Sequence, residues 1–409
     1  MTSPARLWPW SLYAAMIAAA GLPIYIHAPK FYVDIYGVSL ASLGLVLGVL
    51  RLIDVVQDPA LGWLAERSRH RRGAMVAVAA ALMALSMAAL LAVPPPTAPL
   101  LWFALTLLVL FSAFSFLTIC FYAQGVAFAP TLGPKGHLQL AGWREGGALI
   151  GISLAAVAPV ALTPLTGHPF ATFAWGFAAL ALIATLAMRG QWGAAPLTGA
   201  PGFGPVLRDR MARRLLILSL VNGAPVAVTS TLFLFFVESR LAAPGWEGPL
   251  LLLFFLAAAL STQVWSRAAT THGAKPVLLA GMTLATLSFA FALTLGSGDT
   301  LAFAVICLAS GAALGADMVL LPAIFARHLA GRFPGAEALA FGLWSFASKL
   351  ALALAAVTLL PLLDTGGFTA GAQNTDAALS LLTLLYAGLP CLLKLAAIAL
   401  LLATPVPVA

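Results

Sequence analysis

Long apolar runs are the feature that most constrains how this chain can fold. They are separated by charged or Gly- and Pro-rich segments and lie at about 8–29, 40–65, 73–94, 99–128, 139–163, 169–189, 214–240, 247–267, 275–296, 299–327, 335–362 and 377–403. A helix needs about 20 apolar residues to cross a bilayer. Because lipid cannot satisfy an open backbone, only helices and closed barrels span membranes. The runs predict an all-α integral membrane protein with twelve transmembrane helices.

The composition excludes a water-soluble fold. Of the 409 residues, 62% are hydrophobic and only 8% are charged, whereas a soluble domain carries about 25% charged residues. The net charge of +8 would suggest nucleic-acid binding in a soluble protein. Here most basic residues lie in short loops between apolar runs, so we exclude nucleic acid as a partner and expect a lipid bilayer instead.

The basic residues also predict an orientation. Lys and Arg gather in the loops that follow the second, fourth, sixth, eighth and tenth runs, with Lys30 and Arg240 as exceptions. The intervening loops contain neither residue; they lie at 93–98, 164–168, 297–300 and 363–376. Basic loops remain on the cytoplasmic side. We therefore expect both termini in the cytoplasm and the chain in a bacterial inner membrane.

The longest connection, 190–213, divides the runs into six and six. It is rich in Gly and Pro, which is typical of a flexible linker. We expect residues 1–189 to form an N-terminal six-helix bundle and residues 214–409 a C-terminal one. The sequence contains no nucleophile–base set, metal-binding cluster or nucleotide loop, so we predict neither an enzyme nor a cofactor.

Ionisable residues within the second run suggest a cation site. Asp54 and Asp58 are four residues apart and share one face of a helix. Two such carboxylates in a low dielectric cannot both stay ionised without a cation or proton between them. The pattern indicates a Na⁺ or H⁺ site, with Thr118 of the fourth run as a further oxygen ligand. In the alternatives, Arg51 simply neutralises Asp54 while Asp58 lies in water, and Thr118 bonds back to its own helix.

Other runs also contain charged residues, which are costly in a membrane and mark functional candidates. Arg144 and Glu145 open the fifth run and either contact a solute or gate the inner end, or else form an interfacial pair. Lys349, in the middle of the eleventh run, is predicted to line a cavity or to form a salt bridge. Asp317 either pairs with Lys349, binds a proton or makes a satisfied polar contact. Lys394 is interpreted as interfacial or structural.

Uncharged side chains complete the predicted solute site. Tyr122 lies on the fourth run, and Asn222 lies beside Pro225 in the seventh, where a broken turn exposes backbone. Trp344 lies five residues before Lys349 and is expected to stack on a ligand. The predicted solute contacts are thus Tyr122, Arg144, Asn222, Trp344 and Lys349.

The loop after the second run carries a recognisable motif. In GWLAERSRHRRG, Gly62 is followed by Glu66 at +4 and by Arg67, Arg71 and Arg72 at +5, +9 and +10. This pattern resembles the inner-loop signature of the major facilitator superfamily, with Glu in place of the usual Asp. The resemblance implies a fold of two six-helix bundles and a loop that locks the two halves at the cytoplasmic face. Gating or salt-bridge roles are predicted for Arg51, Glu66, Arg67, Arg71, Glu145 and Asp317.

A second segment narrows the resemblance. RLIDVVQDPALGW is similar to a segment of the glycoside–pentoside–hexuronide:cation symporters. The resemblance implies that Asp54 and Asp58 bind Na⁺ or H⁺, and it matches Arg144 and Lys349 to basic residues of that family. A family Asp in the fourth span is replaced by Thr118, and a Lys–Asp pair in the first span is also missing. These departures argue against a glycoside as the solute.

We therefore expect cation-coupled symport of a small organic solute, anionic or amphipathic, by alternating access in a monomer. The alternatives are an H⁺-driven exporter of drugs or metabolites and a non-transporting assembly or sensor protein on the same fold. The buried charges favour a bound cation, since three positive groups face four negative ones. These are Arg51, Arg144 and Lys349 against Asp54, Asp58, Glu145 and Asp317.

Overall fold

The computed structural model describes residues 7–193, 203–369 and 373–405. Its regular structure is entirely helical over these residues, with no strand. The helices are α1 (Trp8–Ala19), α2 (Leu22–Tyr36), α3 (Leu40–Arg67), α4 (Arg72–Leu91), α5 (Pro99–Phe128), α6 (Gly136–Leu162), α7 (Pro169–Met188), α8 (Phe203–Arg208), α9 (Arg210–Phe235), α10 (Glu247–His272), α11 (Ala274–Ala292), α12 (Thr300–Arg332), α13 (Glu337–Thr365), α14 (Asp376–Thr383) and α15 (Leu389–Leu402). Short 3-10 turns are η2 (Arg69–Arg71), η3 (Ala129–Leu132) and η4 (Arg189–Gln191), and π-helical turns are η5 (Phe236–Arg240) and η6 (Leu384–Gly388).

Every predicted apolar run coincides with one helix or with consecutive helical segments. In the described part of the chain, nine helices are long and apolar enough to cross a membrane. The prediction of an all-α membrane protein is confirmed.

The first run was expected as one span over 8–29, which is wrong in detail. The structure ends α1 at Ala19 and begins α2 at Leu22. Gly21 between them has φ −89° and ψ −114°, outside the helical region, and α2 has a proline at its start. Because proline fits the first turn of a helix but breaks its interior, the new helix begins at Leu22, one residue before Pro23.

The described chain divides into two units. Unit 1 comprises 1–206 and 326–346, and unit 2 comprises 207–325 and 347–409. The end of α12 and the beginning of α13 thus belong to unit 1. Residues 194–202 of the expected linker lie outside the described residues, and the rest of it contains η4 and α8. The division at 190–213 stays a prediction.

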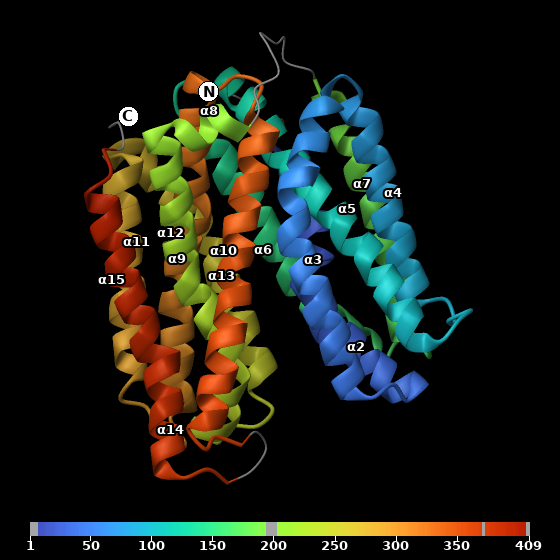
Figure 1. The fold of residues 1–409 in the computed structure, drawn as a ribbon, viewed down its shortest axis with the longest axis vertical. Coiled ribbons are helices and arrows are strands. Elements are labelled where there is room, and N and C mark those ends of the chain that lie inside the picture. The colour runs from blue at the N-terminus through green and yellow to red at the C-terminus, as the bar shows by residue number, and fades with distance from the viewer. Residues whose placement is uncertain (1–6, 194–202, 370–372, 406–409) are drawn as a thin grey trace. The chain divides into compact units, whose positions relative to one another are not determined.

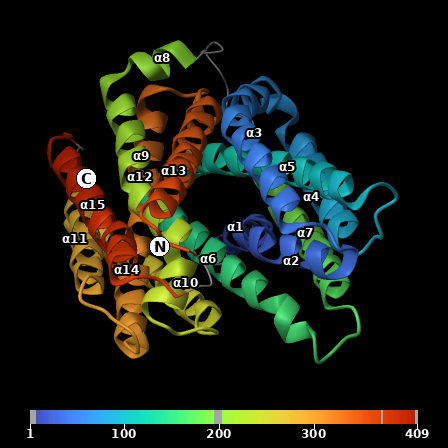
Figure 2. The same cartoon turned by 60° about the horizontal axis from the view of Figure 1, so that its bottom comes forward.

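Unit 1 packs its helices closely at glycines. In Figures 1 and 2, α3, α4, α5 and α7 lie beside one another, and α1 packs on α6 and α7. A Cβ atom added at Gly147 of α6 would lie 2.1 Å from the Ser11 carbonyl oxygen, and one at Gly151 would lie 2.2 Å from that of Ala15. These two glycines therefore bring α6 against the backbone of α1, as small residues do in membrane helix pairs.

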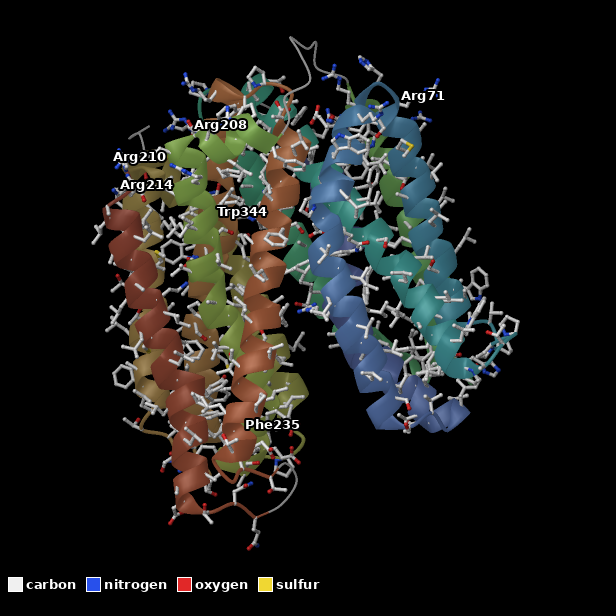
Figure 3. The ribbon with its side chains drawn as sticks, in the orientation of Figure 1. Arg71, Arg208, Arg210, Arg214, Phe235 and Trp344 are labelled. Atoms are coloured by element: carbon white, nitrogen blue, oxygen red, sulfur yellow. The ribbon has the colours of Figure 1, made fainter. Side chains whose placement is uncertain are left out.

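In unit 2, a glycine likewise brings α10 and α12 into close contact. A Cβ added at Gly311 would lie 2.3 Å from the Phe254 carbonyl oxygen. On the other side of the unit, α15 packs against α9 and α11. Figure 3 shows Arg208, Arg210 and Arg214 together where α8 meets α9, with Phe235 far along α9.

Candidate functional site

The two carboxylates of α3 are buried, as expected of a cation site. The side chain of Asp54 is 5% exposed and that of Asp58 is 0% exposed. They lie one turn apart on α3, so both belong to the same stretch of unit 1. The alternative, in which Asp58 lies in water, is not supported by this burial.

A polar network from α5 reaches Asp54. Ser115 and the neighbouring Gln57 donate hydrogen bonds to Asp54 Oδ1 at 3.1 and 3.0 Å. Ser112 donates to Gln57 Oε1 at 2.8 Å and so fixes the amide. Thr118 instead donates to the Phe114 carbonyl of its own helix at 2.8 Å. The hydroxyl that contacts Asp54 therefore comes from Ser115, three residues before the predicted Thr118.

A second buried cluster joins α5 and α6. Arg144 Nε donates to Glu145 Oε1 at 2.9 Å, and the Tyr122 hydroxyl donates to the same oxygen at 2.6 Å. The Arg144 guanidinium carbon lies 3.7 Å from the Tyr122 ring centroid, a cation–π contact. Arg144 is 4% exposed and Glu145 is 2% exposed. The structure brings these three predicted residues together in the interior of unit 1 and does not extend the charged pair to water.

Where α3 ends, it crosses the beginning of α13 within unit 1. A Cβ added at Gly62 would lie 2.8 Å from the Ala338 carbonyl oxygen, and one at Gly342 would lie 2.9 Å from that of Asp58. Only glycine fits at these two positions without displacing a backbone. The crossing also places the predicted cation helix directly against α13.

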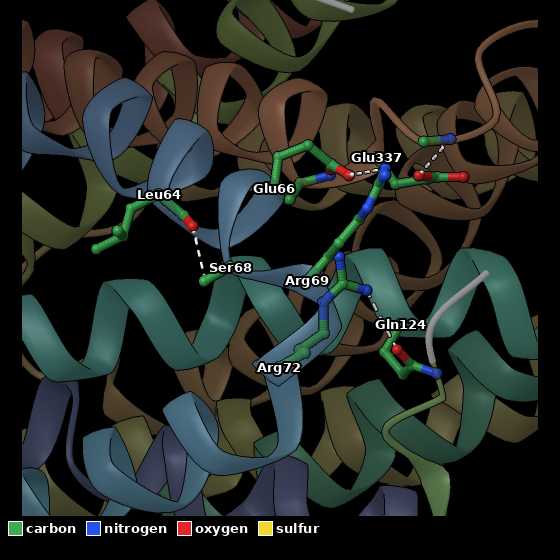
Figure 4. Close-up of polar contacts among 9 residues, drawn as sticks. Leu64, Glu66, Ser68, Arg69, Arg72, Gln124 and Glu337 are labelled. Atoms are coloured by element: carbon green, nitrogen blue, oxygen red, sulfur yellow. Dashed lines mark hydrogen bonds and ion pairs between the residues drawn. The ribbon is translucent and has the colours of Figure 1, made fainter. Parts of the chain in front are cut away.

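Glu66, near the end of α3, also contacts the beginning of α13 (Figure 4). Its Oε2 accepts a hydrogen bond from the backbone N–H of Ala338 at 3.3 Å, in the first turn of α13. A carboxylate at a helix N-terminus is stabilised by the unpaired N–H groups and the helix dipole. Arg69 forms an ion pair with Glu66 at 3.7 Å. Glu337 accepts from the Gly335 N–H at 2.9 Å and completes the turn.

The arginines of the motif between Gly62 and Arg72 are not buried and exposed in the way that the motif predicts. Arg67 and Arg71 are exposed, and Arg67 lies 5.4 Å from the centroid of the Trp63 ring. Arg72 is buried and donates to Gln124 Oε1 of α5 at 3.2 Å. The positions +5 and +9 of the motif therefore face outward, while Arg69 and Arg72 make the internal contacts.

His137 adds a neutral group near this end of unit 1. It lies in the first turn of α6, ahead of the apolar run at 139–163. Burial, with Arg327 and Arg144 nearby, lowers the pKa of His137 to about 4. The imidazole therefore adds no further positive charge at neutral pH.

Unit 2 contains a buried ion pair. Lys394 Nζ lies 2.5 Å from Asp317 Oδ2 and donates to Asn222 Oδ1 at 2.7 Å. The three residues come from α15, α12 and α9, and Asp317, Asn222 and Lys394 are 8%, 4% and 4% exposed. Lys394 is therefore internal and not interfacial, and Asn222 serves this pair.

This pair corrects the count of buried charges. The sequence count of three positive groups against four negative ones left out Lys394, which lies late in the last run. With Lys394 included, the same count is four against four. The buried set in the structure is different, because Arg51 and Lys349 are half-buried while Glu66, Arg72 and Glu337 are buried. A count of charges therefore does not decide whether a cation is bound.

Three further predicted residues lie on α3 and α13. Arg51 is half-buried on α3, and Lys349 is half-buried on α13 in unit 2. Trp344, labelled in Figure 3, belongs to unit 1, with its ring centroid 6.4 Å from that of Phe341. Phe341 in turn lies 5.1 Å from Tyr122, so an aromatic row leads from Trp344 to the Arg144 cluster.

Known structures share the fold of this chain. A crystal structure of a bacterial homologue of the iron transporter ferroportin, in an outward-facing state, aligns with a TM-score of 0.71 and 15% identity, over 97% of this chain and 98% of that one. The crystal structure of the human organic anion transporter MFSD10 aligns with a TM-score of 0.66 and 16% identity, over 96% and 100%. Identities this low show the fold alone. Among curated proteins, none matches the sequence.

A match over nearly the whole sequence identifies the family of this chain. Residues 11–407 match the family model described as MFS/sugar transport protein, which is nearly the whole chain. The resemblance to the major facilitator superfamily and to its glycoside–pentoside–hexuronide branch is thereby confirmed, and with it the interpretation as a membrane transporter and not an enzyme. The chain belongs to the MFS/sugar transport protein family.

Proposed function

We propose that this transporter couples the movement of a small organic solute to a cation, by symport through alternating access. The observation that carries the proposal is the burial of Asp54 and Asp58 one turn apart on α3. Close carboxylates in a low dielectric favour uptake of a cation or proton, because each disfavours ionisation of the other.

The neighbours of Asp54 suit a small hard cation. Ser115 and Gln57 are neutral and fix the carboxylate by hydrogen bonds. Hard cations prefer carboxylate, hydroxyl and carbonyl oxygens. We assign Asp54 and Asp58 to the coupling ion, Na⁺ or H⁺, and propose Ser115, in place of the predicted ligand Thr118, as the hydroxyl of α5 that serves this site.

The solute is proposed to be anionic or amphipathic. Arg144, Tyr122 and Trp344 supply a guanidinium and an aromatic row in unit 1. Since Glu145 neutralises Arg144, an anionic solute would compete with Glu145 for the guanidinium. Lys349 in unit 2 remains a candidate solute contact.

The orientation is also a proposal, with both termini in the cytoplasm. Arg214 Nη1 donates to the Ala403 carbonyl at 3.3 Å, and Lys275 Nζ donates to those of Leu402 and Thr404 at 3.0 and 2.8 Å. Basic side chains thus surround the C-terminal end of α15, where the helix dipole is negative. This grouping of positive charge supports the side predicted from the loops.

Thermal unfolding of the purified protein in NaCl tests Na⁺ coupling, with choline chloride as the ionic-strength control. An ion that binds only the folded state stabilises it by about 2.7 kcal/mol at 100 times its Kd. We expect Na⁺ to raise the Tm of the wild type and to lose most of this effect in Asp54→Asn and Asp58→Asn. Asp364→Asn, an exposed carboxylate in unit 2, is the matched control and should behave as the wild type.

Two other results would change the coupling ion or the direction of transport that we propose. A Tm that responds to pH but not to Na⁺, with the response lost in Asp58→Asn, assigns H⁺ as the coupling ion. Solute efflux from vesicles that is driven by H⁺ and unchanged by Na⁺ supports the H⁺-driven exporter and contradicts Na⁺ symport.

A further inference from the structure

Unit 2 contains a cavity that the proposed function does not use. Its volume is about 40 Å³, and α9, α10, α11, α12 and α15 form its wall. This volume is roughly three times the 10–15 Å³ that one water-sized occupant needs. Thr286, Phe289 and Cys391 of the wall are only half-buried, so the cavity is not sealed from its surroundings. The space therefore suits a short molecule that enters from outside unit 2.

Most of the wall is apolar. More than half of its residues carry hydrocarbon side chains, among them Phe254 of α10, Phe289 of α11 and Leu314 of α12. Apolar side chains that face a void lose the dispersion contacts that a packed neighbour would give them, and apolar cavities accordingly take up small apolar molecules. The wall therefore favours an occupant with a hydrocarbon part.

One polar atom of the wall lacks a partner. Asp317 Oδ2 is bound by the Lys394 ammonium, whereas the buried Oδ1 has no hydrogen-bond partner among the described residues. The Asp317 side chain is 8% exposed and lines the cavity. A buried acceptor without a donor is costly, so an occupant that offers a hydrogen-bond donor to Asp317 is favoured.

The hydroxyl and thiol groups of the wall have given their protons to backbone carbonyls. Thr229, Thr286 and Ser310 each donate to a carbonyl of their own helix, at 3.1, 2.9 and 2.6 Å. The Cys391 thiol donates to the Thr286 carbonyl at 3.5 Å. Because a hydroxyl has a single proton, these groups present lone pairs to the cavity, which disfavours an anionic occupant.

The charge of the wall disfavours a cationic occupant as well. Lys394 Nζ lies 2.5 Å from Asp317 Oδ2 and donates to Asn222 Oδ1 at 2.7 Å, so the carboxylate already has its positive partner. A second positive charge at this depth would be uncompensated and costly to desolvate. The occupant that fits is neutral.

We propose that this cavity binds a short-chain neutral alcohol, whose hydroxyl donates to Asp317 Oδ1 and whose alkyl chain packs on Phe254, Phe289 and Leu314. Small-molecule sites commonly combine an apolar wall with a few polar groups that fix the orientation of the ligand. The site goes beyond the proposed function, because no residue assigned there to the cation or the solute belongs to this wall.

The test compares 1-butanol with diethyl ether, an isomer that has the same atoms but no O–H donor. Saturation-transfer NMR on the full-length protein in deuterated detergent measures the binding of each. We expect 1-butanol to bind about tenfold more tightly or better, the ratio that a hydrogen bond to a charged acceptor supports. Butylammonium, which has a donor and a full positive charge at neutral pH, should bind more weakly than 1-butanol.

A cavity-filling variant locates the binding. Ala285→Leu adds hydrocarbon to a residue of the wall, and we expect it to abolish saturable binding of both molecules. Ala290→Leu is the matched control, because Ala290 lies on an exposed face of the same helix. It should bind 1-butanol as the wild type does, with the same partitioning into detergent.

A second variant isolates the hydrogen bond. Asp317→Leu/Lys394→Met removes both charges together, and replacing a buried ion pair by apolar side chains is often neutral for stability. We expect this variant to bind 1-butanol and diethyl ether with equal affinity.

Alkylation of Cys391 by N-ethylmaleimide gives an independent readout, because this thiol lines the cavity. We expect 1-butanol to slow the reaction several-fold and diethyl ether to slow it less. A Ser297→Cys variant places a control thiol in an exposed loop of unit 2, and 1-butanol should leave its alkylation rate unchanged.

Equal affinity of the wild type for 1-butanol and diethyl ether overturns the role of Asp317. Saturable 1-butanol binding that persists in Ala285→Leu lies elsewhere and overturns the site, as does the absence of any saturable binding to the wild type. Tighter binding of butylammonium overturns the neutral class of ligand. Each of these outcomes leaves the Asp54–Asp58 proposal standing, because neither aspartate belongs to this wall.

Discussion

Glu145 Oε1 receives two donors, from Tyr122 and from Arg144, and Tyr122 also lies beneath the guanidinium. Each of the three side chains therefore holds the other two in place. Buried polar groups of this kind are costly when a partner is lost. At the scale of single residues, the Tyr122 hydroxyl is the part of the cluster that can be removed with the least change in shape.

Tyr122→Phe should destabilise the protein by about 1.5–3 kcal/mol, since the hydroxyl bonds a charged acceptor. Tyr32→Phe is the control, because the Tyr32 hydroxyl donates to the neutral Leu90 carbonyl at 3.2 Å and its side chain is buried. There we expect about 0.5–1.5 kcal/mol. Reversible unfolding in detergent measures both, and equal losses would contradict a charged role for Glu145.

The residues of the cluster were identified from the sequence, but several partners were not. Arg144 and Glu145 are adjacent, and Asp54 and Asp58 are one turn apart, so their proximity follows from helix geometry. Lys394 and Asp317 are 77 residues apart, and no local pattern joins them. The choice between Ser115 and Thr118 depends on the rotation of α5 against α3, which apolar runs leave open.

At the scale of helices, close glycine contacts decide which pairs meet. Gly151→Ala places a Cβ 2.2 Å from the Ala15 carbonyl oxygen, so α1 must move away from α6. Overpacking of this kind costs about 1–3 kcal/mol.

Gly176→Ala, on an exposed face of α7 with nothing within 4 Å, is the control. It should be neutral or stabilising by up to about 1 kcal/mol, from helix propensity. Unfolding midpoints of the two variants in detergent compare them, and a Gly151→Ala protein as stable as Gly176→Ala contradicts the contact.

Helix boundaries were predictable where polar or Gly/Pro segments end the apolar run. Hydropathy does not show the break between α1 and α2, because the apolar run continues across Gly21–Leu22–Pro23, where Gly and Pro mark a boundary. The π-helical turn Leu384–Gly388 precedes Pro390, whose missing N–H removes a helix bond in that region. The hydropathy of the run does not indicate where this π-helical turn begins and ends.

At the scale of the whole molecule, the Glu66 contact to α13 should bias the transport cycle. Loss of a hydrogen bond to a charged group costs about 1.5–3 kcal/mol, equivalent to a shift of about 10- to 150-fold between two states. Spin labels at the exposed positions Arg67 and Arg332, both in unit 1, report the separation of the two segments.

We expect one short distance in the wild-type background and an added longer distance in Glu66→Ala. Glu66→Gln keeps an oxygen acceptor for the Ala338 N–H and should give an intermediate distribution. An unchanged distribution in Glu66→Ala would show that the contact does not bias the cycle.

The fold was predictable because two kinds of signal agree, the twelve apolar runs and the motif from Gly62 to Arg72. Neither signal indicates how contacts between helices divide the chain into unit 1 and unit 2. Residues 326–346 belong to unit 1 because Ala338 and Gly342 pack on α3, and sequence order alone assigns them to the second half.

The pairing of Arg144 with Glu145 and of Lys394 with Asp317, each inside one unit, has an electrical consequence. A membrane potential does work of about 2.3 kcal/mol per 100 mV on each elementary charge that crosses it. A paired lysine and aspartate that move together carry no net charge, so the field does almost no work on them. The voltage dependence of transport would then be set chiefly by the coupling ion and the solute.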